Sequence, residues 1–206
     1  MNTNQDVSTC NNSVLAEHAN TAIASVSVDL EYDRFVERLA KAEDPRTISN
    51  SSTRHALSIL RAIFRHAKRS VSIFSGKLDP NVFNDDELLR TAENFQKGGG
   101  SLRVLLQDQA LSKNDASKLL LQLAAQSSDV NDASCMVKQV TSEHPFADAK
   151  CHFVVADGKA YRIETDIVKH IAVGSFMDEK SATALTEIFD KAFVLATTKP
   201  FEFSRV

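Results

Sequence analysis

Hydrophobic and polar positions follow two different periods along this chain, one typical of helices and one typical of strands. Apolar residues recur every three or four positions in five segments, a spacing that predicts amphipathic helices with one buried face. A Gly98-Gly99-Gly100 run is expected to end the third of these helices. The five segments are residues 28–42, 54–69, 85–97, 113–126 and 179–195.

Short runs rich in apolar and β-branched residues lie between these helices and predict strands. Asp157-Gly158 predicts a tight hairpin, because both residue types tolerate the positive φ of such a turn. Strands that alternate with helices early and form a hairpin late predict an α/β fold, a mixed sheet flanked by helices in an α/β/α sandwich. The expected strands are residues 71–74, 102–106, 135–140, 151–156, 160–164 and 171–176.

The first residues of the chain do not share this periodicity. Residues 1–27 are rich in Asn, Ser and Thr, and their apolar residues are too scattered to define a buried face. They are therefore expected to form a flexible N-terminal tail. Residues 28–206 are expected to form a single domain, because a chain of 206 residues suffices for one domain or at most two.

Composition narrows the class of protein. A hydrophobic content of 43% and a charged content of 25% are ordinary for a soluble globular domain, and a net charge of -3 gives no global attraction to nucleic acid. The cysteines Cys10, Cys135 and Cys151 have no Cys-x-x-Cys spacing, which argues against a disulfide framework or a zinc site. No run of about 18 apolar residues predicts a membrane span. We expect a cytoplasmic protein without a metal or cofactor.

Candidate chemistry gathers at the ends of the later strands. Lys150 and His152 begin one predicted strand, Asp157 ends it, and Gly174-Ser175 ends another. An ammonium, an imidazole and a carboxylate near a Gly-Ser turn can hold an anion or share a proton. Each residue also has a structural interpretation: a histidine packed at a strand end, a solvated lysine, and an aspartate and a Gly-Ser pair that serve turns.

The order of elements over roughly residues 53–196 resembles a single phospholipase D-like domain. The resemblance depends on three places: residues 65–69 leading into residues 71–76, the hairpin at residues 157–159, and residues 173–176 before an acidic helix start. That family has a His-x-Lys signature, an Asp after four more residues, and a later Gly-Ser pair. The resemblance implies that the histidine attacks phosphorus, the lysine binds phosphate and the aspartate supports a histidine.

This chain departs from that signature. Counting back from Asp157, Lys150 occupies the histidine position and His152 the lysine position, and Gly174-Ser175 lies farther away than usual. A lysine ammonium is protonated near neutral pH and has no lone pair with which to attack phosphorus. We therefore predict a catalytically inactive, bacterial-type phospholipase D-like domain that binds a partner protein or an anionic ligand. The candidate ligand-binding residues are Lys150, His152, Asp157, Gly174 and Ser175.

Two alternative functions stay open. One is a phosphodiesterase or nuclease that uses His152, Lys150 and Asp157 in an altered arrangement. The other is a non-hydrolytic nucleic-acid accessory protein, although a solvated helix face explains the same basic pattern. The resemblance also implies a homodimer, because active members bring two motifs together across a two-fold axis. The candidate nucleic-acid residues are Arg54, Arg61, Arg65, Lys68 and Arg69.

Overall fold

The computed structural model describes residues 28–127, 135–169 and 171–204, so the tail predicted for residues 1–27 lies outside the described part. Residues 28–41 are helical, close to the predicted range of 28–42. The helices that follow are α2 (Thr53–His66), α3 (Pro80–Phe83), α4 (Asp86–Lys97), α5 (Lys118–Ser127) and α6 (Glu179–Phe193).

The strands form one mixed sheet in the order β1-β7-β6-β5-β2-β3-β4-β8. Only β2, β3 and β4 run parallel to one another, and the remaining neighbours are antiparallel. The predicted α/β class with a mixed sheet is therefore confirmed. The strands are β1 (Ile48–Asn50), β2 (Ser70–Ser75), β3 (Ser101–Leu106), β4 (Cys135–Val140), β5 (His152–Ala156), β6 (Ala160–Asp166), β7 (Ile171–Ser175) and β8 (Thr198–Pro200).

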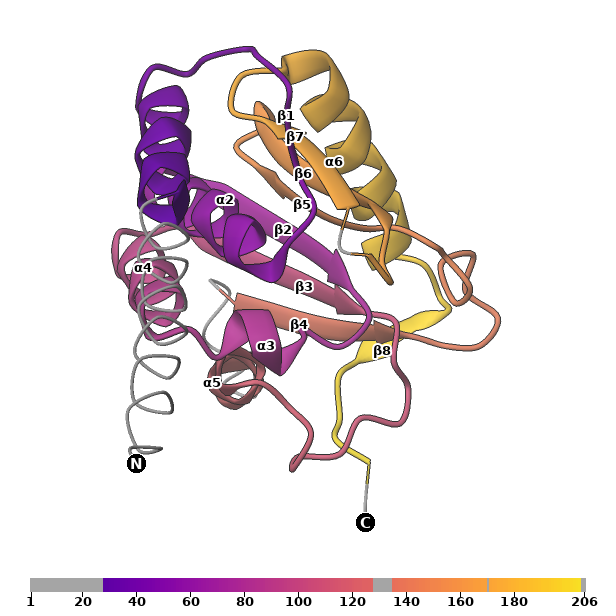
Figure 1. Ribbon diagram of the computed structural model, residues 1–206. Helices are drawn as coiled ribbons and strands as arrows, with labels where there is room; N and C mark the ends of the chain where they lie inside the picture. Colours follow the sequence, from indigo (N-terminus) through magenta and orange to yellow (C-terminus); the bar gives the residue numbers. More distant parts are fainter. Residues whose placement is uncertain (1–27, 128–134, 170, 205–206) are drawn as a thin grey trace, which may run out of the picture.

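Helices cover both faces of the sheet (Figure 1). The larger apolar core packs α2, α4 and α5 on one face, and a smaller core packs α6 on the other. Adjacent strand residues contribute to different cores: Ile73 of β2 belongs to the first and Phe74 to the second. This separation follows from the two-residue period of a strand, which points successive side chains to opposite faces.

Helix α2 ends earlier than its sequence pattern predicts. The Ser52 hydroxyl caps its start by accepting the His55 N–H at 3.1 Å, and Ala67 already has an extended conformation. Lys68 and Arg69, predicted as helical, instead lead into β2 because the Asp157 carboxylate accepts their backbone N–H groups at 2.8 and 2.9 Å. A distant side chain therefore fixes this boundary.

Helix α5 begins later than predicted, and three short elements were not predicted. The helix predicted for residues 113–126 begins only at Lys118, because Ser112 and Asp115 hold the preceding residues in a turn through a 2.6 Å hydrogen bond. The three-residue strands β1 and β8 and the short helix α3 were not predicted. Segments of this length contain too few residues to show a period.

Candidate functional site

A cavity of about 610 Å³ lies at the carboxyl ends of β2 and β3. Strand β2 has the parallel neighbour β3 on one side and the antiparallel neighbour β5 on the other. The chain adds β3 and β4 on one side of β2 and then returns to add β5 on the other, so the strand order reverses at β2. In open α/β sheets, ligands commonly bind outside the carboxyl ends of strands at such a place. The volume also falls within the range of about 300–1,000 Å³ of small-molecule sites.

His152 lies at the polar end of this cavity, opposite Glu164 in the β5–β6 pairing. Its Nδ1 is 3.3 Å from Glu164 Oε2, and the two side chains are only 18% and 13% exposed. Arg162 Nη2 donates to Glu164 Oε1 at 3.1 Å, and Arg162 Nε donates to Asn50 Oδ1 at 3.1 Å. A buried polar row therefore joins β5, β6 and β1.

Two members of this row, Glu164 and Arg162, stabilise each other's charged forms. Burial favours the neutral acid of Glu164, but the hydrogen bond to His152 and the charge of Arg162 together hold the Glu164 pKa below its ordinary value. Burial lowers the pKa of Arg162, and the Glu164 carboxylate opposes that shift. The Glu164 carboxylate is therefore the hydrogen-bond acceptor that faces Nδ1 of His152.

The far edge of the His152 ring packs against Gly76, at the end of β2. A Cβ placed on Gly76 would lie 3.3 Å from both Cε1 and Nε2 of the imidazole. Lys150 and Lys77 also line the cavity, so the structure brings the sequence candidates Lys150 and His152 to one site. An imidazole whose Nδ1 faces a largely buried carboxylate can exchange a proton with a ligand at Nε2, or donate to an anion when both ring nitrogens carry protons.

Asp157 lies at the opposite end of β5 from His152. Five residues of strand at roughly 3.3 Å each separate them by about 16 Å. Its carboxylate accepts the backbone N–H groups of Lys68, Arg69 and Ser70 at 2.8, 2.9 and 2.9 Å. Asp157 and Gly158 both have positive φ, 53° and 68°, in the predicted hairpin turn. Within one chain, Asp157 therefore joins two loops and does not approach the cavity.

Gly174 and Ser175 are not among the residues that line the cavity. A Cβ on Gly174 would lie 2.6 Å from the Tyr161 carbonyl oxygen, so only glycine fits where β6 and β7 approach. The buried Ser175 hydroxyl donates to the Pro45 carbonyl oxygen and accepts the Met177 N–H, both at 3.3 Å. The close approach of the strands explains the glycine at position 174, and hydrogen bonds to backbone groups explain the serine at position 175.

Sequence reasoning missed Glu164, Arg162, Asn50 and Gly76 as parts of this site. One signal was present for Glu164, because residues paired across a hairpin lie at equal distances from its turn. Counting outward from the Ala156 and Ala160 pair places His152 opposite Glu164. Asn50 had no such signal, because β1 comes near Arg162 of β6 only when both strands flank β7 in the folded sheet.

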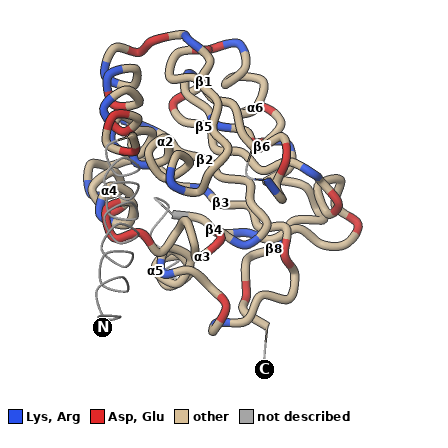
Figure 2. Tube along the Cα trace, in the orientation of Figure 1, with Lys and Arg blue, Asp and Glu red and all other residues tan. Residues whose placement is uncertain are grey.

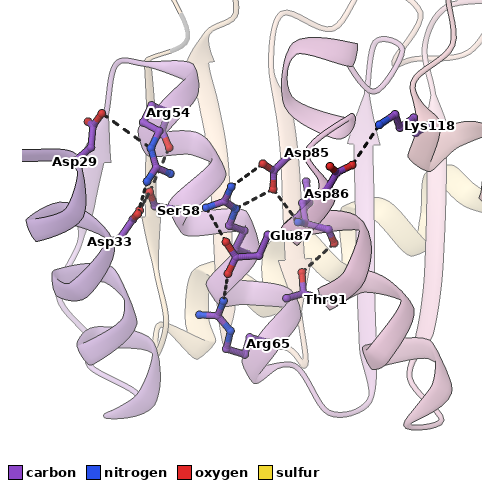
Figure 3. Close-up of polar contacts among 12 residues, drawn as sticks. Asp29, Asp33, Arg54, Ser58, Arg65, Asp85, Asp86, Glu87, Thr91 and Lys118 are labelled. Atoms are coloured by element: carbon purple, nitrogen blue, oxygen red, sulfur yellow. Dashed lines mark hydrogen bonds and ion pairs between the residues drawn. The ribbon is translucent and has the colours of Figure 1, made fainter. Parts of the chain in front are cut away.

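The basic face of α2 is largely paired with acidic residues of neighbouring helices (Figure 3). Arg54 forms ion pairs with Asp29 and Asp33, and Arg65 with Glu37 and Glu87. Basic and acidic residues consequently alternate over this side of the molecule (Figure 2). Arg61 likewise contacts Asp85 at 2.6 Å and Glu87 at 3.0 Å, and the Arg69 guanidinium donates to the Asp157 carbonyl oxygen at 3.3 Å.

Residues 28–127, 135–169 and 171–204 contain no cluster of three or more His, Cys, Asp or Glu side chains placed to hold a metal ion. No helix in these ranges is both long and apolar enough to cross a membrane.

Several solved structures are similar to this chain at low sequence identity. NucT from Helicobacter pylori has a TM-score of 0.53 and 10% identity, and the alignment covers 76% of this chain and 100% of NucT. Nuc from Salmonella typhimurium, a phospholipase D family member, has a TM-score of 0.49 and 11% identity over 77% of this chain and 99% of Nuc. TrmBL2, an archaeal chromatin protein, has a TM-score of 0.49 and 10% identity over 91% of this chain and 68% of TrmBL2.

The likeness to NucT shows a shared α/β fold, and at this identity it shows no more than the fold. No curated protein sequence matches the chain. One family profile does match, and it covers residues 52–200, which include α2 through β8. The chain therefore belongs to the family described as a domain of unknown function, DUF7931, and it has a phospholipase D-like α/β fold.

Proposed function

We propose that this chain is a catalytically inactive phospholipase D-like domain that binds a small anionic ligand in the cavity at His152. The observation that carries the proposal is the His152 imidazole, held by the buried Glu164 carboxylate at the polar end of a 610 Å³ cavity. With protons on both ring nitrogens, an imidazole fixed in this way can donate a hydrogen bond from Nε2 to an anion. The rim lysines Lys77 and Lys150 add positive charge at the entrance.

Phosphodiester hydrolysis needs more than a positioned imidazole. The transferring phosphoryl group is stabilised chiefly by cationic groups aimed at its oxygens. Arg162 already donates to Glu164 and Asn50. Lys150 stands where the phospholipase D-like signature has its histidine. Asp157 and Ser175 make hydrogen bonds to backbone groups outside the cavity. These arrangements support binding without turnover.

Binding can be tested with 8-anilinonaphthalene-1-sulfonate, a fluorescent probe with one sulfonate on an apolar body. We expect saturable fluorescence with the folded chain and weaker binding to His152→Gln, because the glutamine lacks a cationic form. Lys180→Gln, an exposed change on α6, is the matched control and should bind as the unaltered chain does. Equal affinities for all three chains, with near-UV circular dichroism showing intact packing, would refute the proposed site.

A hydrolytic function is the second candidate, and one observation favours it. The carboxylate that contacts His152 Nδ1 leaves Nε2 as the nitrogen available for attack or proton transfer. Hydrolysis of bis-p-nitrophenyl phosphate by the unaltered chain that disappears in His152→Ala would replace the binding proposal with this one. Equal background rates for both chains would remove it.

Two further proposals concern partners. A homodimer would have twice the 22.7 kDa mass of the chain, which light scattering at several concentrations measures directly. A nucleic-acid accessory function requires the α2 arginines to exchange their carboxylate partners for phosphates. DNA binding that weakens with salt and in an Arg61→Glu/Arg65→Glu variant would support that function. DNA binding that changes neither with salt nor in the Arg61→Glu/Arg65→Glu variant would show that α2 is not the DNA-binding surface.

A further inference from the structure

We infer that the ligand of the His152 cavity is an amphiphilic monoanion, with one carboxylate or sulfonate on an apolar body, and not a phosphate ester. This inference rests on the proposed binding function and narrows its ligand class. It follows from the charges that line the cavity, from how those charges are already used, and from the composition of the walls.

The charged side chains of the described lining balance one another. Burying a charge is costly unless an opposite charge or hydrogen bonds compensate it. The formal charges of these side chains sum to zero, so a bound monoanion adds one uncompensated negative charge to the cavity and a phosphate dianion adds two. The basic members are Lys77, Lys150 and Arg162, and the acidic members are Asp79, Asp108 and Glu164.

The acidic members of the lining are held in place by the chain itself. Asp79 accepts the Asn81 N–H at 3.0 Å at the start of α3, and Asp108 accepts the Ala110 N–H at 2.9 Å. Both carboxylates therefore stay beside the cavity, where they repel additional anionic oxygens. A phosphate ester carries more such oxygens than a carboxylate does and meets more of this repulsion.

Apart from Ser75 and Gln107, the remaining side chains of the lining are apolar and come from both the helices and the sheet. Such walls favour a ligand whose body is hydrocarbon, because apolar surface gains free energy when it leaves water. A sugar or a nucleotide would instead leave hydroxyl groups without partners against them. The buried apolar lining residues include Ala56, Leu60, Ile73, Val82, Phe83 and Val154.

The polar end is also rigid before a ligand arrives. The Gln107 side-chain amide donates to the carbonyl oxygens of Phe146, Ala147 and Ala149 at 3.0, 2.8 and 3.1 Å. These bonds fix the loop that leads to Lys150 and His152. A site arranged in advance loses little conformational entropy on binding, so a single charge pair can select the head group.

Competition among ligands with one tail and three head groups tests the inference. Octanoate, n-octanol and n-octyl phosphate would each displace bound 8-anilinonaphthalene-1-sulfonate at pH 7, where a phosphate monoester carries a charge near -2. Octanoate should displace the probe at about tenfold lower concentration than either competitor, the factor expected for one charge-assisted hydrogen bond. His152→Gln should abolish this preference, and Lys180→Gln should keep it.

The outcomes separate the ligand class from the binding function. Tightest binding of octyl phosphate or of octanol would overturn the monoanion inference while the cavity remained a binding site. An octanoate preference that persists in His152→Gln would also overturn it. If the probe binds but no octyl compound displaces it, the inference fails. If the probe itself does not bind the folded chain, the proposed function fails and the inference fails with it.

Discussion

Asp157→Ala provides the clearest test of whether Asp157 serves the fold or a binding site. Its carboxylate accepts three backbone N–H groups, from Lys68, Arg69 and Ser70, between 2.8 and 2.9 Å. These bonds tie the connection between α2 and β2 to the turn between β5 and β6. Alanine removes all three acceptor contacts and must also adopt the positive φ of 53° at this position.

The expected loss of stability is about 3 kcal/mol. A net contribution of roughly 0.5–1 kcal/mol for each hydrogen bond is appropriate here, because water can reach the freed amides. A left-handed conformation adds about 1 kcal/mol for alanine, which lacks the local hydrogen bonding that makes Asp and Asn tolerant. For a domain of this size, a loss of about 3 kcal/mol lowers Tm by roughly 6–12 °C.

Urea unfolding and thermal unfolding of the unaltered chain, Asp157→Ala and Asp157→Asn measure this effect. Asparagine keeps one acceptor oxygen and tolerates the positive φ, so it should lose about a third as much stability. Folded Asp157→Ala should bind 8-anilinonaphthalene-1-sulfonate with unchanged affinity. An unchanged Tm for Asp157→Ala, or a loss of probe affinity without a loss of stability, would refute the structural role.

Further predictions concern the close strand approach, the buried charges and the ion pairs of α2. Gly174→Ala should cost about 2 kcal/mol in urea unfolding, because its Cβ would lie 2.6 Å from the Tyr161 carbonyl oxygen. The folded pKa of Glu164 lies below the ordinary 4.5, so the stability that it contributes is present above about pH 4.5 and is lost as pH falls through the folded value. The unfolding free energy of the unaltered chain should therefore fall more steeply with acid than that of Glu164→Gln. Arg61→Ala should cost about 1–2 kcal/mol, because Arg61 is only 16% exposed and bonds the Asp85 carboxylate that caps α4.

Each of these predictions has a control or a contradicting result. Ala182→Gly, at a fully buried helix position, shows how much a single methyl group contributes elsewhere in the core. If the unfolding free energy falls equally steeply with acid in the unaltered chain and in Glu164→Gln, the charged state of Glu164 is contradicted. Lys97→Ala breaks an exposed pair with Glu93 and should cost less than about 0.5 kcal/mol, so a loss equal to that of Arg61→Ala would contradict the role of burial.

Much of the fold was readable because its elements are locally encoded. The apolar stripe of α2 and the strand Cys135–Val140 lie where the hydrophobic period predicts them. The Asp157-Gly158 hairpin was predicted because its residue types suit positive φ. Strands β1 and β8 were not predictable, since each exists by pairing with the distant strands β7 and β4.

The site was only partly readable, because residue type indicates chemistry but not partners. Lys150 and His152 were predicted to share a site, and both line the cavity. Asp157 and Ser175 were placed with them because strand ends looked equivalent in the sequence. The sheet directions put those ends on opposite sides, and nearby amides and carbonyls use both side chains.

The sequence by itself determined most of the helices and longer strands and the hairpin turn. Those features depend on neighbouring residues and on residue identity. Only the tertiary structure decided which charges meet: Arg162 reaches Asn50 across 112 residues, and the α2 arginines meet carboxylates 21 to 28 residues away. A hydrogen bond or close ion pair requires side-chain atoms within about 3 Å, and strand register and helix packing set that distance.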